Sequence, residues 1–250
     1  MVDMTAEAAA SPAPPMAGSR PSEDHSILAD IVQWDVGNWG RAIRMWDREL
    51  RGDWAGKRAL DMGAGGGGLT LYLCRRGCRV AYCDSKPPRD EARDLFRRYD
   101  IVDDIEYCQA DVTRLPYGDE QFDLVAFKSL LAVASRYGGW ETQVAILTEA
   151  HRVLKKNGIL LFAENAYGSR LHAFGRRHFV AWGRELHYPT LDEYRRLLQP
   201  FNSVELESFG VLAAFGRREW QRRMLSRVDH LINPIFREKS RYLVYGYARK

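Results

Sequence analysis

The sequence lacks the long apolar segments that mark membrane-spanning and secreted proteins. No run of about 18 or more apolar residues occurs in the 250-residue chain, so no membrane span is expected. Residues 1–24 have neither a basic opening nor a continuous apolar stretch, which argues against a secretory signal. Their Ala, Pro and Ser bias, with few large apolar side chains, predicts a disordered tail.

Cysteine is also scarce. The four cysteines are Cys74, Cys78, Cys83 and Cys108, and no pair has the two-residue separation of a zinc knuckle. Cys74 and Cys78 would share one face of a helix, where small buried side chains are the simplest interpretation. We therefore predict no metal site. Reduced thiols and the missing signal favour a cytoplasmic location.

Acidic residues are few in the last third of the chain. Residues 170–250 contain 16 Lys and Arg but 8 Asp and Glu, whereas the net charge of the whole chain is only +4. The excess predicts either an anionic acceptor or surface as partner, or a solvated arginine-rich face without a partner.

Alternating apolar runs and helical patterns predict an α/β protein. Strands are expected at 58–62, 79–84, 105–110, 122–127, 158–163 and within SVELESFG and RYLVYGYAR near the C-terminus. Helices are expected at 69–76, 88–99, 141–156 and 217–232, and in two pieces over 27–50. This order is typical of a doubly wound, mostly parallel, seven-stranded sheet with helices on both faces and a ligand at the carboxyl ends of its strands.

The stretch ALDMGAGGGGLTLYL, residues 59–73, places five glycines in six positions between a strand and a helix. So bare a backbone lets another molecule touch the main chain, and the following helix directs free N–H groups at it. Gly63, Gly65 and Gly68 satisfy the dinucleotide pattern G-x-G-x-x-G, with Asp84 as the ribose acid. Against a nicotinamide or flavin site, Asp61 would place negative charge beside the pyrophosphate.

Four motifs in order are more specific than the glycines alone. They are DMGAGGG from Asp61, the acid Asp84 that ends RVAYCD, QADVTRLPYGDEQFDLV around Asp111, and RVLKKNG further on. Together, over roughly residues 56–165, they resemble the class I S-adenosylmethionine-dependent methyltransferases, in their small-molecule branch (methyltransferase type 11/25-like). The resemblance implies a Rossmann-like sheet and S-adenosyl-L-methionine as the cofactor.

The resemblance also assigns the cofactor contacts. Asp61 would face the ammonium group, directly or through water, and Asp84 would accept from both ribose hydroxyls. Asp111 would accept from the adenine amino group, Val112 would donate its N–H to the adenine ring, and Lys128 would lie under the methionine part. The full set is Asp61, Gly63, Ala64, Gly65, Gly67, Asp84, Ser85, Asp111, Val112 and Lys128.

The acceptor side has fewer sequence markers. We expect it to be built from the N-terminal helices, the loop after the fourth strand and an insertion at about 166–190. Candidate general bases are His172, then Glu164, then His187, although a structural role is the commoner one for such residues.

The N-terminal segment is rich in tryptophan. Residues 25–55 are predicted to form a helical lid over the main domain, 56–250, with Trp34, Asn38 and Trp39 lining an apolar or aromatic acceptor pocket. The basic helix at 217–232 carries an apolar stripe, which usually packs on a sheet and otherwise suits a membrane surface.

These features predict methyl transfer from S-adenosylmethionine to an oxygen or nitrogen of a small organic acceptor, with an anionic or lipid-linked acceptor as options. The alternatives are an RNA or protein methyltransferase and a cofactor-binding partner subunit without chemistry of its own. Nucleic-acid signals are weak, because FKSLL stands where base methyltransferases of this fold carry Asp/Asn-Pro-Pro-aromatic. A monomer or a homodimer is expected.

Overall fold

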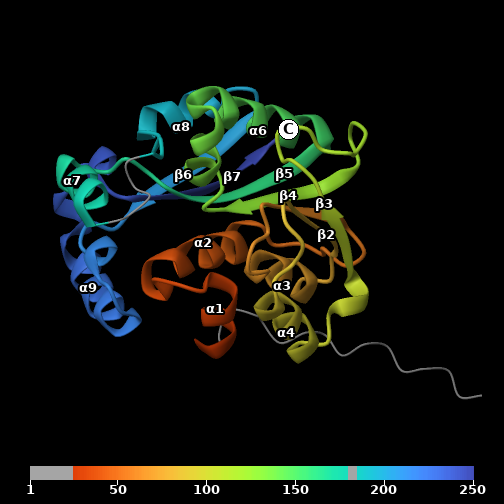
Figure 1. Ribbon diagram of the computed structural model, residues 1–250, viewed down its shortest axis with the longest axis horizontal. Helices are drawn as coiled ribbons and strands as arrows, with labels where there is room; N and C mark the ends of the chain where they lie inside the picture. The colour runs from red at the N-terminus through yellow and green to blue at the C-terminus, as the bar shows by residue number, and fades with distance from the viewer. Residues whose placement is uncertain (1–24, 180–184) are drawn as a thin grey trace, which may run out of the picture.

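A seven-stranded sheet forms the centre of the protein (Figure 1). The computed structural model describes residues 25–179 and 185–250, and within them the strand order is β3-β2-β1-β4-β5-β7-β6. The strands are β1 Arg58–Met62, β2 Arg79–Asp84, β3 Ile105–Gln109, β4 Phe122–Lys128, β5 Leu154–Asn165, β6 Ser203–Phe209 and β7 Leu243–Arg249. β1 to β5 are parallel, and β7 is antiparallel to both of its neighbours. The doubly wound, mostly parallel, Rossmann-like sheet expected from the sequence is confirmed.

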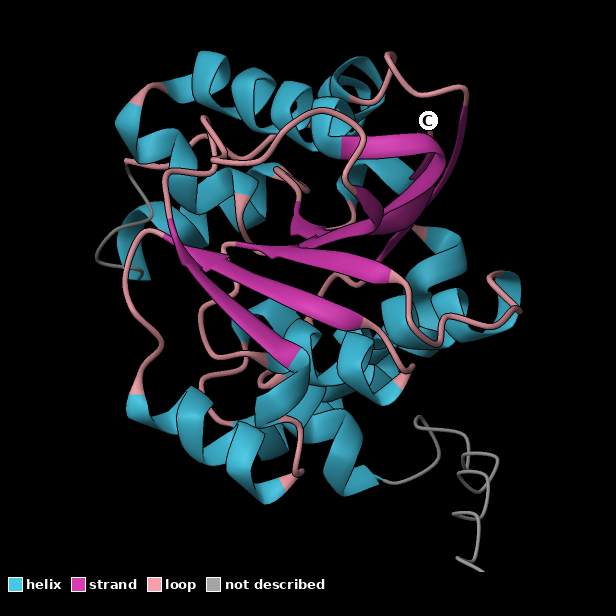
Figure 2. Ribbon diagram, turned by 90° about the vertical axis from the view of Figure 1, so that its right-hand side faces the viewer, coloured by secondary structure: helices cyan, strands magenta, loops and turns pink. Residues whose placement is uncertain are grey.

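Helices cover both faces of this sheet (Figure 2). They are α1 His25–Val32, α2 Val36–Glu49, α3 Gly68–Arg75, α4 Asp90–Arg98, α5 Leu131–Ala134, α6 Gly139–Val153, α7 Arg170–Phe179, α8 Leu191–Leu197 and α9 Glu219–Ile232. The 3-10 turns are η1 Val102–Asp104, η2 Ser135–Tyr137, η3 Ala213–Phe215, η4 Asn233–Ile235 and η5 Glu238–Ser240. In Figure 1, α1 to α4 lie below the sheet, α6 and α8 lie above it, and α7 and α9 stand at one end.

Each face of the sheet has its own hydrophobic core, as expected for strands buried on both sides. The lower core includes Trp46, which is fully buried and donates its indole N–H to the Gly246 carbonyl at 2.8 Å. One expected boundary is wrong: α6 ends at Val153 and β5 begins at Leu154, not at 158. Leu154 pairs with Phe122 of β4 across a bulge, so strand pairing ends the helix before RVLKKNG is complete.

A buried polar network joins the N-terminal helices to the C-terminal part. Asn38 donates to Asp229 at 2.9 Å and to the Tyr242 hydroxyl at 2.8 Å, while the Ser226 hydroxyl donates to Asn38. The Tyr242 hydroxyl in turn donates to Asp35. Because Asp35, Asn38 and Asp229 are fully buried, these partners replace the water that each group lost on folding.

Replacing Asp35 by asparagine is expected to remove part of the pH dependence of stability. Burial raises the pKa of Asp35 from 3.8 to about 7, against the opposing hydrogen bond from Tyr242. The folded chain therefore holds this proton more tightly than the unfolded chain, and its contribution to stability, complete below about pH 4, is lost as the pH rises toward 7. Asparagine keeps the shape and carries no charge, so Asp35→Asn should gain roughly 2–4 kcal/mol at pH 8 and little at pH 4.

Urea denaturation at several pH values measures this difference. Asp103→Asn, at an exposed position in η1, is the matched control and should follow the wild-type curve. A wild-type pH slope in Asp35→Asn would contradict the prediction.

The remaining expectations concern the N-terminal tail, the insertion, the cysteines and membrane spans. The predicted tail, 1–24, lies outside the described residues, as do residues 180–184 of the predicted insertion. All four cysteines are free thiols. Among the described helices, none combines the length and the apolarity that a bilayer crossing needs.

Candidate active site

The carboxyl ends of β1, β2 and β4 meet where the strand order reverses. β1 pairs with β2 on one side and with β4 on the other, so the chain leaves these strands in opposite directions. An open α/β sheet binds ligands at such a switch point, because the diverging loops leave a crevice there. The glycine loop after β1 and Asp84 at the end of β2 both lie at this edge.

Gly65 is the open position of the glycine loop. A side chain at Gly65 would contact only the Gly63 carbonyl, at 3.7 Å, and its φ of +52° lies in the left-handed region that favours glycine. Its N–H donates to Asp84 Oδ2 at 3.0 Å, and its carbonyl accepts from the Tyr82 hydroxyl at 2.6 Å. Tyr82, which sequence reasoning did not select, therefore holds the loop in place from β2.

Gly66 and Gly68 have no room for a side chain, because other parts of the protein fill the space beside them. A side chain at Gly68 would lie 2.0 Å from the Ile31 carbonyl oxygen of α1, and one at Gly66 would meet the Gln33 amide. Gln33 also donates to the Gly66 carbonyl at 2.8 Å. The N-terminal segment thus packs directly on the glycine loop, and only part of the glycine content is left for a ligand.

Two backbone N–H groups hold the Asp84 carboxylate. Gly65 donates to Oδ2, and Lys86 donates to Oδ1 at 3.1 Å. The side chain is half-buried and each oxygen accepts only one backbone N–H, so the two oxygens can also accept from a pair of neighbouring hydroxyls. Ser85 is exposed beside it, with its hydroxyl 3.5 Å from Asp84 Oδ1.

Asp111 lies in an exposed turn after β3. Its Oδ1 accepts from both the N–H and the hydroxyl of Thr113 at 2.8 Å, which fixes the carboxylate. No described residue donates to Oδ2, which is left as an acceptor. Val112, half-buried beside it, packs against the upper core.

A buried charge cluster lies beneath this edge. Burial raises the pKa of Asp61 to about 7, against the opposing hydrogen bond from the Thr70 hydroxyl at 2.7 Å. Burial also lowers the pKa of Lys128 to about 8, while the charges of Glu164 and Asp61 act in the opposite direction. The Lys128 ammonium lies 5.2 Å from the centre of the Trp39 ring. Asp61 is only 2% exposed, so direct contact with a ligand is more restricted than the sequence suggested.

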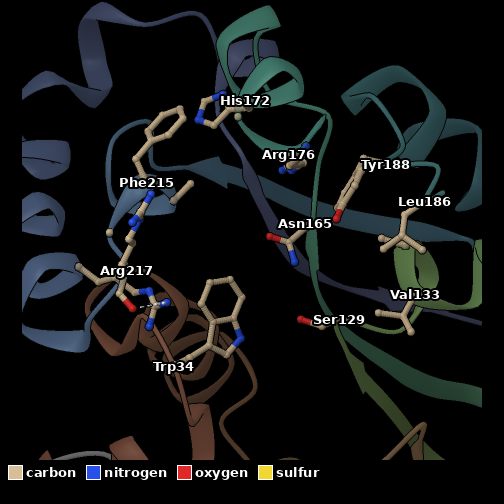
Figure 3. A pocket seen from close by; sticks show the side chains of 15 residues that line it. Trp34, Ser129, Val133, Asn165, His172, Arg176, Leu186, Tyr188, Phe215 and Arg217 are labelled. Carbon is tan, nitrogen blue, oxygen red and sulfur yellow. Dashed lines mark hydrogen bonds between the residues drawn. The ribbon is translucent and has the colours of Figure 1, made fainter. Parts of the chain in front are cut away.

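A cavity of about 790 Å³ opens beside the ends of β4 and β5 (Figure 3). Its lining residues are Trp34, Ser129, Ala132, Val133, Asn165, His172, Gly175, Arg176, Leu186, Tyr188, Ala214, Phe215, Gly216, Arg217 and Arg222. In Figure 3, Phe215 and Arg217 lie across the cavity from Asn165 and Tyr188, with Trp34 below. The N-terminal segment, the loop after β4 and the segment after β5 all line it, and these are the segments expected from the sequence to form the acceptor side.

The middle of the chain matches a known family. Residues 60–162, which include the glycine loop, Asp84 and Asp111, match the family model described as a methyltransferase domain. These residues therefore form a methyltransferase domain. Four of the positions predicted to contact the cofactor interact in two pairs: Gly65 donates to Asp84, and the charges of Asp61 and Lys128 act on each other.

Two curated relatives illustrate the family. The chain is 29% identical over 150 residues to the ubiquinone/menaquinone biosynthesis C-methyltransferase UbiE of Vibrio vulnificus, covering 56% of this chain and 54% of that one. It is 31% identical over 112 residues to a fatty-acid O-methyltransferase of Mycolicibacterium smegmatis, covering 45% and 38%. The chain therefore matches about half the length of these relatives, or less.

Solved structures share the fold of the methyltransferase domain. Phosphoethanolamine N-methyltransferase 2 of Haemonchus contortus, solved with S-adenosyl-L-methionine, has a TM-score of 0.60 at 17% identity and covers 88% of this chain and 56% of that one. Geranyl diphosphate C-methyltransferase of Streptomyces coelicolor has a TM-score of 0.56 at 17% identity and covers 84% and 78%.

His172 lines the cavity and is held there by structural contacts. Its Nδ1 accepts from the Ser169 N–H at 3.0 Å and lies 2.9 Å from the Ser169 hydroxyl, and its Nε2 donates to the Val211 carbonyl at 2.7 Å. Burial lowers its pKa, and the ring stacks on Phe215. With both nitrogens occupied, the ring has no free acceptor for a substrate proton, which argues against the expected role of first base.

The other two base candidates also make structural contacts. Glu164 is fully buried and accepts the N–H groups of Leu130 and Leu131 at the start of α5, and burial raises its pKa to about 7. Its Oε2 has no hydrogen-bond partner among the described residues. His187 does not line the cavity, although its neighbours Leu186 and Tyr188 do, because alternate side chains of an extended segment face opposite ways.

The expected lid residues separate into two groups. Trp34 lines the cavity, with its ring 4.9 Å from that of Trp39. Asn38 and Trp39 do not: Asn38 is buried in the polar network, and Trp39, 1% exposed, packs beside Lys128. The prediction that they line this cavity is therefore wrong, since the polar network holds Asn38 and the hydrophobic core holds Trp39 within the fold.

The wall formed by η3 and the start of α9 was missed by sequence reasoning. Phe215, Arg217 and Arg222 line the cavity, yet they follow β6, far along the chain from the other walls. The available signal was the basic segment at the start of α9, but the sequence predicts for this helix only packing on the sheet or contact with a membrane surface. Tertiary packing brings this segment to the site: η3 lies against α7, where a side chain added at Gly175 would meet Phe215 at 3.0 Å.

Proposed function

We propose that the protein transfers a methyl group from S-adenosylmethionine to an oxygen of a small acceptor that has a negative charge and an apolar or aromatic body. The observation that carries this proposal is the cavity beside the ends of β4 and β5. Three arginines and several aromatic rings line it, and no acidic side chain does so among the residues the structure describes.

The cofactor residues fit S-adenosylmethionine on their own chemistry. Asp84 offers two carboxylate oxygens for the ribose hydroxyls, and Asp111 offers Oδ2 for the adenine amino group. The Ser129 hydroxyl is buried without a partner at the cavity wall, and Lys128 precedes it at the end of β4. When bound, the cofactor supplies a methyl group activated by its sulfonium, so the chain need only position and desolvate the acceptor.

The three arginines support recognition of an anion. Arg176 donates to the carbonyls of Ala166 and Tyr167, and its guanidinium lies 3.9 Å from the centre of the Tyr188 ring. Arg222 donates to the Arg217 carbonyl and pairs with a carboxylate on its own helix. The Arg217 guanidinium has no partner in the described part of the chain, so it is the group left to bind an acceptor anion.

An acceptor oxygen that is already anionic would explain why none of the expected general bases is free to remove a proton. His172 has both ring nitrogens occupied, Glu164 caps α5, and His187 does not line the cavity. A carboxylate or phenolate oxygen has no proton to lose before it attacks a methyl group. Transfer to such an oxygen therefore needs no general base, and the structural contacts of the three candidate bases do not prevent it. The relatives include C- and O-methyltransferases, and the latter chemistry suits an arginine-lined cavity better.

The assay that tests this proposal measures S-adenosylhomocysteine release with aryl and alkyl carboxylates, each paired with its neutral amide. Release with the carboxylates and formation of the methyl ester are expected. Binding of the cofactor without release for any acceptor would support a partner subunit without chemistry. Release with RNA or protein alone would replace the small acceptor.

Arg217→Gln is expected to raise the KM for an anionic acceptor by about 10-fold and to change kcat little. The variant removes one charge-assisted contact, worth about 1.5–3 kcal/mol, that acts before and during transfer alike. Arg79→Gln is the matched control, because Arg79 is exposed at the start of β2, at the opposite edge of the sheet. Steady-state kinetics at saturating cofactor separates the two constants. Equal KM values for wild type and Arg217→Gln would exclude Arg217 as the anion contact.

A further inference from the structure

Helix α9 carries an uncovered apolar stripe. Trp220, Met224, Val228 and Leu231 are 57%, 59%, 41% and 76% exposed, and Ile235 in the turn that follows is 80% exposed. Their spacing of three and four residues places them along one side of the helix. The sequence-based expectation that this stripe packs on the sheet is therefore wrong.

The other side of α9 fixes the rotation of the helix. Asp229 is fully buried and accepts the N–H groups of Val211, Leu212 and Ala213 at 2.6–3.0 Å. At the start of the helix, Glu219 accepts the N–H groups of Asp35 and Val36. Turning the apolar stripe inward would leave Asp229 and several backbone donors unpaired, so its exposure is a stable property of the fold.

Positive charge flanks the stripe. Arg223 and Arg227 are exposed, follow the same side of the helix next to the stripe, and have no partner among the described residues. Arg237 and Lys239, just beyond the helix, are exposed as well. The two acids of α9 are Glu219 and Asp229, and both face the protein, so no acid of this helix balances Arg223 and Arg227. Glu238, exposed between Arg237 and Lys239, lies 3.7 Å from Arg195.

We propose that this stripe docks on the surface of a bilayer that contains anionic lipid, with α9 lying parallel to the surface. Trp220, Met224 and Leu231 enter the boundary between headgroups and acyl chains, and Arg223 and Arg227 contact lipid phosphates. A second copy of the chain is the poorer occupant, since a two-fold contact would bring the arginines of one copy beside those of the other.

The proposed docking places the cavity near the membrane. Gly216 and Arg217, which line the cavity, directly precede α9, and Arg222 belongs to it. Helix α7, which lines the cavity next to η3, also exposes two apolar side chains, Leu171 and Phe174, at 57% and 54%. An amphiphilic acceptor could then enter from the lipid phase, a consequence that rests on the proposed function, whereas the docking itself does not.

Vesicle flotation of the full chain tests the docking. Phosphatidylcholine vesicles are compared with vesicles that also contain phosphatidylglycerol, at low and high salt. Wild type should bind the anionic vesicles, and more weakly at high salt. Met224→Glu/Leu231→Glu should bind at least about 10-fold more weakly, because two apolar anchors become charged. Arg223→Gln/Arg227→Gln should lose roughly 10-fold and much of the salt dependence.

Control variants and a direct contact measurement complete the test. Val102→Glu/Val144→Glu places the same charges at two exposed apolar residues of other elements, η1 and α6, which are 44% and 41% exposed, and should bind as wild type does. Brominated lipid should quench tryptophan fluorescence in wild type and do so less in Trp220→Phe. Absent binding to anionic vesicles, or an equal loss in the control, would overturn the proposal. So would a dimer in sedimentation velocity that Met224→Glu/Leu231→Glu dissociates, because the stripe would then be the dimer interface.

Discussion

Replacement of Asp84 by asparagine is expected to weaken the binding of S-adenosylhomocysteine by roughly 100-fold. The Asp84 carboxylate accepts one backbone N–H on each oxygen, from Gly65 and from Lys86, and keeps lone pairs for two ribose hydroxyls. In asparagine the NH₂ group must face one of these N–H donors, and the charge is lost. Each charge-assisted hydrogen bond contributes about 1.5–3 kcal/mol, so the loss of two amounts to a factor of about 100 or more.

Isothermal titration calorimetry of the purified chain measures this loss. Asp90→Asn is the control, because Asp90 is an exposed carboxylate at the start of α4 and should bind as tightly as wild type. Thermal unfolding of both variants without ligand separates a binding defect from a folding defect. An affinity within about three-fold of wild type for Asp84→Asn would remove Asp84 from the ribose site.

Gly68→Ala is expected to destabilise the chain by about 3 kcal/mol and to weaken cofactor binding about 10-fold. The new Cβ would lie 2.0 Å from the Ile31 carbonyl oxygen and 2.9 Å from its carbon, which are backbone atoms of α1 that no side-chain rotation can clear. Overpacking against a fixed group typically costs about 1–3 kcal/mol. Moving α1 also breaks the contact from Gln33 to Gly66, so the glycine loop loses its support.

Urea denaturation and limited proteolysis test this prediction. Gly52→Ala is the matched control, since nothing lies within 4 Å of a side chain added there. Gly68→Ala should be cut faster between α1 and α2, while Gly52→Ala should resist as wild type does. Unchanged stability and unchanged cleavage in Gly68→Ala would show that α1 does not press on the loop in solution.

The sheet could be predicted from the sequence because its signals are local. Apolar runs such as FDLVAF in β4 are longer than a half-buried strand needs, and the helical patterns between them require parallel strands. The boundary of β5 was missed because pairing of Leu154 with Phe122, a contact between distant residues, overrides the helical pattern. Local preference is a weak guide wherever strand pairing competes with it.

The candidate site divides in the same way. Asp84 ends one expected strand and Asp111 follows another, and their predicted roles depend on position at a strand end, which sequence spacing specifies. The functions of His172 and Asn38 depend on partners about 40 or more residues away, such as Val211 and Tyr242. No pattern in the sequence shows that these partners occupy the atoms a substrate would need.

The sequence by itself determined which segments form strands and helices, where the glycine loop lies, and which acids stand at strand ends. Each of these depends on residues that are neighbours in the chain. Tertiary structure alone decided which glycines pack against protein and which polar residues are buried in hydrogen bonds to other parts of the fold. It also brought η3 and α9 to the cavity wall and turned the apolar side of α9 outward. The physical reason is that Asp229 can satisfy the N–H groups of η3 and the preceding loop only in one rotation of α9.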